Sequence, residues 1–272
     1  MALCQDPEVS YLNSLGYNVV AEPTATLSPL EVLGQNSDGV LDLGPLSSIW
    51  TTTAAPPAIS APQQAASISG GQTSNLSVSI GLSLLSGIVT TLGGQTPGLS
   101  ASYGSAASMQ VTLGDVTVSS VTLTDLGAYL EAGDVNMANP AVAPYFQNSS
   151  ATVVVVYEIL QSNSITVTTT AAPNATLSID SAALSQAVGG NLTIGPVAGQ
   201  PSSGSTSTLV YTGNVPLTFA FKALHIAFVN GQWQLLGDDL NPALGTLGAP
   251  APTSLNPVSL VTKGLLSIAK VF

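Results

Sequence analysis

Long stretches of this chain alternate apolar residues with serine, threonine or glycine. The clearest stretches are residues 109–125, 151–170 and 205–236. Successive side chains of a β-strand point to opposite faces, so this alternation is typical of strands that bury one face. The pattern predicts that strands form the framework of the fold.

Short polar or glycine-containing sequences mark turns and irregularities in these stretches. Ser162-Asn163 predicts a hairpin within the second stretch, and Asn230-Gly231, in the third, is the strongest hairpin signal in the chain. Within the first stretch the apolar phase changes after Gly114 and again after Ser119-Ser120. Such changes of phase predict bulges or bends.

Helices are predicted around this framework. Residues 6–16 have Asp6 as a helix N-cap and Gly16 as a C-terminal glycine. Residues 75–94 fit a strand to about Ser79 that is followed by a helix. Two further short helices have the candidate N-caps Thr124 or Asp125, and Asp180 or Ser181.

The last part of the chain differs from the body. Residues 237–257 contain four prolines, which predicts a linker. The apolar residues that follow are spaced as in a short amphipathic helix. The predicted organisation is a body over 1–237, a proline-rich linker over 238–257 and a C-terminal peptide over 258–272, and the predicted class is α+β.

Charged residues make up only 6 % of the chain, against about 25 % in ordinary soluble domains. The net charge of −11 comes from 14 acidic residues and three lysines, with no arginine. We expect no nucleic-acid partner, because too few cations are present to neutralise phosphates. Membrane contact would have to be driven by apolar surface or by a covalent lipid. The N-terminus lacks the pattern of a secretory signal, so we expect an intracellular protein.

The residues needed for common enzyme chemistry are scarce. His225 is the only histidine, and it lies in a strand-like run without a nucleophile motif beside it. One histidine and one cysteine, far apart, disfavour a metal site. The glycine pairs match neither phosphate-binding pattern. We therefore expect a protein that is not an enzyme and that holds no cofactor or metal.

Several short sequences in order along the chain resemble the bacterial gasdermins. They are Cys4, Asp6-Pro7, YLNSLGYNVV (11–20), Pro29-Leu30, LGPLSSIW (43–50), IGLSLLSGIVTTLGG (80–94), the segment Tyr103 to Ala106 and GAYLEAGDV (127–135). The resemblance implies a twisted, mainly antiparallel central sheet with short peripheral helices and a C-terminal covering peptide. It also implies a cytoplasmic monomer that forms membrane pores once a partner protease, encoded nearby, removes that peptide. The active form is a homo-oligomeric ring in the cell inner membrane whose β-hairpins span the lipid.

The resemblance assigns roles to particular residues. Cys4 matches the family's N-terminal cysteine, which carries a palmitoyl group. A palmitoyl group on Cys4 would be the only covalent cofactor of this chain. The autoinhibitory contacts are expected from the apolar side of the C-terminal peptide, at Leu260, Leu265, Ile268 and Phe272. The implied function is a pore-forming effector of anti-phage defence.

The site of proteolysis follows from the composition of the linker. It contains no lysine or arginine, so a trypsin-like enzyme would find no cation for its specificity pocket. Cleavage after an apolar or acidic residue is expected, and Leu244 and Leu247 are favoured because no proline follows them directly.

The chain departs from the family in one respect, and its composition also fits another interpretation. Gasdermins rely partly on basic residues at the membrane, and this chain has few. A surface or adhesin-like β-structural protein, favoured by the serine and threonine content and the low charge, is the alternative.

Overall fold

The computed structural model describes residues 7–65, 74–76, 78–91, 105–147, 151–173, 192–194, 206–237, 256–260, 266 and 268–270. Its helices are α1 (Pro7–Ser14), α2 (Leu46–Ile49), α3 (Val78–Thr91), α5 (Leu123–Glu131) and α6 (Ala143–Gln147). Its strands are β1 (Asn18–Thr24), β2 (Glu31–Asn36), β3 (Gly39–Pro45), β4 (Trp50–Thr52), β5 (Gln63–Gln64), β6 (Ser74–Leu76), β7 (Ala106–Gly114), β8 (Thr117–Ser120), β9 (Gly133–Val135), β10 (Thr152–Ala171), β11 (Leu192–Ile194), β12 (Thr206–Val229), β13 (Gln232–Leu236) and β14 (Ile268–Lys270).

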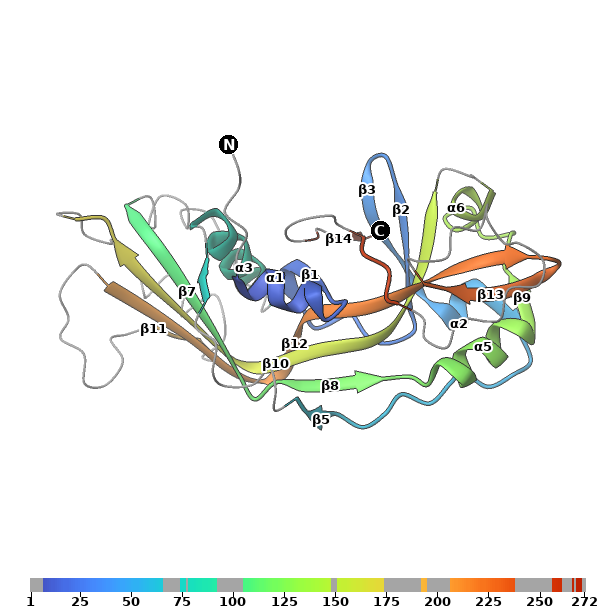
Figure 1. The fold of residues 1–272 in the computed structure, drawn as a ribbon, viewed down its shortest axis with the longest axis horizontal. Coiled ribbons are helices and arrows are strands. Elements are labelled where there is room, and N and C mark those ends of the chain that lie inside the picture. The colour runs from blue at the N-terminus through green and yellow to red at the C-terminus, as the bar shows by residue number, and fades with distance from the viewer. Residues whose placement is uncertain are drawn as a thin grey trace.

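One large sheet organises the fold, and its longest path runs β1-β12-β10-β2-β3-β14. Among the strands that the structure describes, the pairings are antiparallel except that of β14 with β3. The strands β10 and β12 run side by side through the length of the molecule, with α1 and α3 along their middle part and α5 toward one end (Figure 1). The predicted class, α+β with a mainly antiparallel sheet and short peripheral helices, is confirmed.

The two halves of β10 are packed differently. Residues 153–156 are all buried, and alternate side chains enter two separate hydrophobic clusters on opposite faces of the sheet. From Ile165 onward only alternate residues are buried, against a third cluster that includes Leu85 and Ile88 of α3. We call residues 152–160 the enclosed half of β10 and residues 164–171 its one-faced half.

The predicted hairpin at Ser162-Asn163 is wrong, because β10 continues through it as one strand. The β10–β12 register shifts between Ser162 and Ser164 instead. The Ser162 hydroxyl lies 2.6 Å from the carbonyl oxygen of Gly114 and accepts a hydrogen bond from the Ser164 amide at 3.1 Å. A side chain that satisfies backbone groups in this way stabilises a bulge, so the polar pair marks an irregularity and not a reversal.

Other predicted boundaries hold. The hairpin at Asn230-Gly231 joins β12 to β13, with φ of 53° and 83° at the two residues. The change of phase after Gly114 is a break, where Asp115 has a φ of 48° and separates β7 from β8. The strand-then-helix order of β6 and α3 is also confirmed, although the helix already begins at Val78.

The helix α5 begins earlier than predicted. Its N-cap is Thr122, whose hydroxyl accepts from the Asp125 amide at 3.3 Å, and neither Thr124 nor Asp125 has that role. A threonine hydroxyl can satisfy a free amide of the first helical turn. The helix can therefore start directly after Thr122, two residues beyond the end of β8 at Ser120. In the helix that starts there, Leu126 and Leu130 are completely buried. The helix predicted at Asp180 or Ser181 lies outside the described residues.

Candidate functional site

We define the C-terminal segment as residues 256–272; its described residues, 256–260, 266 and 268–270, lie against the body and not apart from it (Figure 1). It enters beside the end of β13, where Gly237 directly approaches the backbone of Asn256. Pro257 then lies over Gly16, whose φ is +83°, and a β-carbon at Gly16 would lie 2.7 Å from the proline ring. Gly16 therefore ends α1 and leaves the space that the segment occupies.

The first anchor of the segment is Val258, which lies on the edge of β12. Asn18 pairs with Phe221 at one end of β1, and the pairing with β13 begins at His225. The Val258 amide donates to the carbonyl oxygen of Ala223 at 2.9 Å, between those two pairings. Val258 thus fills a position on the β12 edge that neither neighbouring strand reaches.

Two side-chain amides hold the next residues. The Asn18 Nδ2 group donates to the carbonyl oxygen of Val258 at 2.8 Å, and its Oδ1 accepts from the Leu260 amide at 2.8 Å. The Gln35 Nε2 group donates to the Leu260 carbonyl oxygen at 3.1 Å. Asn18 is only 4 % exposed, so these hydrogen bonds are made away from solvent.

The second anchor consists of Leu266 and β14. It joins β1 and β3, which are not neighbours in the sheet. The Leu266 amide donates to Val19 O, and the Ala21 amide donates to Leu266 O, both at 2.8 Å. Beginning two residues further along, β14 pairs in parallel with residues 40–42 of β3. The segment therefore bridges the outer edges of β1 and β3.

The amphipathic helix predicted for the C-terminal peptide is wrong in its described residues, which form no helix around Val258 and form a strand in β14. Extended backbone can satisfy the free N–H and C=O groups at the edges of β1 and β3, which a helix cannot do because its own groups are already paired. The sequence carried a signal for this conformation, because serine separates the apolar residues in both Val258-Ser259-Leu260 and Leu266-Ser267-Ile268.

The apolar side chains of the segment complete a hydrophobic cluster of the body. Val258, Leu260 and Leu266 are 2 %, 6 % and 5 % exposed, and they join a cluster that includes Phe221. Ile268 is partly buried against the same cluster. Sequence reasoning named Leu260 and Ile268, and it missed Val258, Leu266 and the body residue Asn18.

Other residues singled out in the sequence lie outside the described parts of the chain. They are Cys4, Leu244, Leu247, Leu265 and Phe272. Their predicted roles stay predictions.

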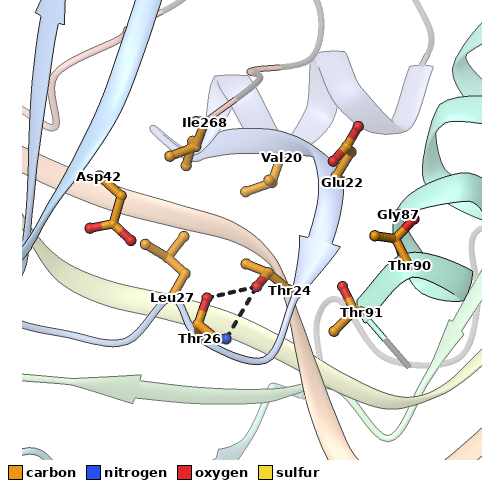
Figure 2. Close-up of a pocket in the computed structure, with 10 residues that line it drawn as sticks. All are labelled: Val20, Glu22, Thr24, Thr26, Leu27, Asp42, Gly87, Thr90, Thr91 and Ile268. Carbon is orange, nitrogen blue, oxygen red and sulfur yellow. Dashed lines mark hydrogen bonds between the residues drawn. The ribbon is translucent and has the colours of Figure 1, made fainter. Parts of the chain in front are cut away.

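A cavity of about 310 Å³ lies next to the second anchor. Figure 2 shows its wall, to which Ile268 of the segment contributes beside Val20 of β1 and Thr91 of α3. The hydroxyls of Thr24 and Thr26 are 2.9 Å apart at its rim. The docked segment is therefore part of the boundary of this cavity.

A charged group lies where β1, β10 and β12 meet. The Glu158 Oε1 atom accepts from the Tyr17 hydroxyl at 2.5 Å and lies 2.9 Å from Lys222 Nζ. Lys222 Nζ also lies 4.3 Å from the centre of the Tyr17 ring. Burial, and then the hydrogen bond to Glu158 and its charge, raise the pKa of Tyr17 well above its usual value.

The described residues offer little for catalysis. They contain no group of three metal-ligating side chains. His225 is half-buried in β12, where it pairs with Val154 and Leu236. Among these residues, no helix is both long and apolar enough to cross a membrane.

Comparison with known proteins agrees with the fold. The model of the Bacterial Gasdermin Family matches residues 20–235. A gasdermin from Vitiosangium sp. is 32 % identical over 257 residues, which cover 93 % of this chain and 94 % of the relative. A gasdermin from Lysobacter enzymogenes is 34 % identical over 236 residues, which cover 86 % and 84 %.

A solved structure supports the same assignment at the level of fold. The structure of a bacterial gasdermin from Bradyrhizobium tropiciagri aligns with a TM-score of 0.62 over 98 % of this chain and 97 % of that chain, at 13 % identity. The chain therefore belongs to the bacterial gasdermin family, a family of pore-forming effectors of cell death.

Proposed function

We propose that this protein is a pore-forming effector that its own C-terminal segment keeps inactive. A partner protease cuts the proline-rich linker, the segment leaves, and the body assembles with further copies into a ring in the cell inner membrane. Before the cut the protein is a cytoplasmic monomer. Its biological role is to kill the host cell during phage infection. Membership of a family of cell-death effectors favours this role over that of a surface protein.

The observation that carries this proposal is the position of the segment in the sheet. Its residues bond to β12, β1 and β3, and three of its apolar side chains complete a buried cluster. Removing it would expose those apolar side chains and leave unpaired backbone groups on the edges of all three strands. Unpaired edges and exposed apolar surface both favour association with other chains.

The one-faced half of β10 and the parts of β7 and β12 beside it are our candidates for membrane insertion. Along residues 165–168 the buried apolar Ile165 and Val167 alternate with Thr166 and Thr168, which are only partly buried. A strand at the wall of a membrane pore needs one apolar face for lipid and one polar face for water. The near absence of charged residues keeps the cost of insertion low.

Truncation tests the proposal directly. Protein that ends near residue 248 should release dye from liposomes and arrest growth, while the full-length protein should do neither. If the truncated form is folded and as inert as the full-length form, the proposed inhibition is wrong.

A charge placed in the docked segment should act like the cut. Leu260→Glu puts a carboxylate at a position that is 6 % exposed, and its burial opposes docking. Ser259→Glu adds the same charge at the neighbouring exposed position and is the matched control. Dye release by the uncut Leu260 variant, with little release by the Ser259 variant, is the expected result.

Cys4 is proposed to carry a palmitoyl group that strengthens membrane attachment. Each buried methylene of an acyl chain contributes about 0.8 kcal/mol. Cys4→Ala should therefore reduce toxicity without unfolding the protein, and intact-mass analysis should show an acyl mass on the native chain. An unmodified thiol in every preparation from the native host would contradict this assignment.

The linker cut is proposed after Leu244 or Leu247. The test is to incubate the protein with the neighbouring protease and determine the new C-terminus by mass spectrometry. An activating cut after Lys222 or Lys263 would overturn the assignment.

A further inference from the structure

The side chain of Asn18 makes two hydrogen bonds to the C-terminal segment, and both are made where almost no solvent reaches. It donates to Val258 O and accepts from Leu260 N, at 2.8 Å each, and is 4 % exposed. We infer that Asn18 is the positioning residue that fixes the register in which the C-terminal segment docks on the body. The inference rests on the proposed function for its consequence, because docking is what keeps the protein inactive.

The two bonds imitate the pairing of a parallel strand. A residue on a parallel strand donates its N–H to the residue before its partner and accepts from the residue after it. The Asn18 carboxamide makes the same pair of bonds to the two residues that flank Ser259. The side chain therefore takes the place of a strand where the segment leaves the edge of β12.

The neighbouring contacts make the register specific. The Val258 amide bonds to Ala223 O, and the Leu260 carbonyl oxygen accepts from Gln35. With Asn18, every backbone N–H and C=O group of Val258 and Leu260 has a partner in the body. A shift of the segment by one residue would break this set and would turn both apolar side chains away from their cluster.

A carboxamide suits this position because it donates and accepts at once. An ionised aspartate of the same shape only accepts, so the Val258 carbonyl oxygen would face a carboxylate. A buried polar group that loses its partner carries the full cost of its desolvation. Asn18→Asp should therefore release the segment without a protease.

The experiment measures docking and pore formation separately on full-length, uncut protein. Hydrogen exchange at the Leu260 amide reports docking, exchange at Val155 reports the integrity of the sheet, and dye release from liposomes reports activity. In Asn18→Asp at pH 8 we expect Leu260 exchange to rise by about tenfold or more, Val155 to stay protected, and dye to be released. Asn36→Asp is the matched control, because Asn36 Oδ1 only accepts, from the Asp38 amide, and a carboxylate can do the same.

Lowering the pH supplies a second readout that a merely structural defect would not show. A protonated carboxyl has one donor and one acceptor, so it can restore both bonds. Burial raises the pKa of an introduced carboxyl, and docking of the Asn18→Asp protein should therefore recover as the pH falls from 8 to 5. The charged and titratable groups near this position are Tyr17, Glu158, Lys222 and His225, which follows Ala223 by two residues on β12. Glu22 and Asp42 lie further along β1 and β3. All of them are also present in the wild type and in the Asn36 control, which we expect to show no such recovery.

The outcomes separate the two claims. Faster Leu260 exchange without dye release supports the role of Asn18 and contradicts inhibition by the segment. Unchanged Leu260 exchange, or release at pH 8 with no recovery at pH 5, overturns the role of Asn18. If Val155 also loses protection, the uncharged Asn18→Ser decides: it should loosen Leu260 alone, and unchanged exchange there overturns the inference.

Discussion

The two halves of β10 belong to one strand but have different surroundings. In the enclosed half, residues 153–156 are packed on both faces, between the cluster that contains Ile226 and the cluster that the C-terminal segment completes. In the one-faced half, Ile165 and Val167 are covered on one face by α3, and Thr170 on the other face is exposed. The halves meet at the register shift around Ser162.

This difference indicates which part of the sheet can be rearranged. A strand packed on both faces cannot move without disrupting two clusters. A strand packed on one face can exchange its apolar cover for another apolar surface, such as lipid, while its polar face stays in water. We therefore expect the enclosed half to remain as the frame of the active body and the one-faced half to be the part that changes its surroundings.

The largest effect is expected in the cluster that covers the enclosed half. Phe221 of β12 is fully buried beside Ile159 of β10. Phe221→Ala should lower the free energy of unfolding by about 3–5 kcal/mol, because it leaves a cavity that the two-sided packing cannot close. Urea denaturation measures the loss, and a change below about 1 kcal/mol would show that this half is not closely packed.

A buried residue of the one-faced half should matter less. Val167 is 1 % exposed and contacts the cluster on one face only. Val167→Ala removes two methyl groups and should cost about 2 kcal/mol. The same urea titration is used, and a loss as large as that of Phe221→Ala would remove the distinction between the halves.

The group of Tyr17, Glu158 and Lys222 near the boundary of the halves should give a dependence on high pH. The pKa of Tyr17 is raised in the folded protein, so its contribution is present below pH 10 and is lost as the pH rises. Above pH 10 the free energy of unfolding should fall by about 1.4 kcal/mol per pH unit for this group. Urea titrations between pH 9 and 11 should show a shallower slope for Tyr17→Phe, and parallel slopes would contradict the assignment.

The smallest effect is expected on the threonine face. Thr168 lies opposite Thr208, with their hydroxyl oxygens 3.5 Å apart, and is partly exposed. Thr168→Val should change the free energy of unfolding by no more than about 0.5 kcal/mol. It should nevertheless slow dye release by the truncated protein, because it makes the water-facing side of the strand apolar. Equal dye release would argue against insertion of this strand.

Local sequence signals predicted the parts of the fold that depend on neighbouring residues. Asn230-Gly231 was read correctly because a tight turn needs residues that accept positive φ, and both residues adopt it. Ser162-Asn163 carries a similar signal, but the hairpin predicted there is wrong. There the outcome depends on Gly114, which is distant in the sequence and bonds to the Ser162 hydroxyl.

The candidate site was predictable only in part for the same reason. The apolar residues of the C-terminal peptide identified it as a covering element, but its conformation depends on free strand edges that only the folded body provides. Asn18 had no signal at all, since its partners Val258 and Leu260 lie about 240 residues away. Nothing near Asn18 in the sequence distinguishes it from another strand residue.

The central claim is that the one-faced half enters the membrane after the segment leaves, and labelling along β10 tests it. Single cysteines are introduced at 153–156 and at 165–168 in a Cys4→Ala background, spin-labelled, and measured for access to lipid-soluble oxygen and to a water-soluble nickel complex. In truncated protein on liposomes, we predict that labels at 165 and 167 become accessible to oxygen and those at 166 and 168 to nickel, while 153–156 stay inaccessible to both. If the pattern at 165–168 is the same with and without liposomes, in protein that releases dye, the account is contradicted.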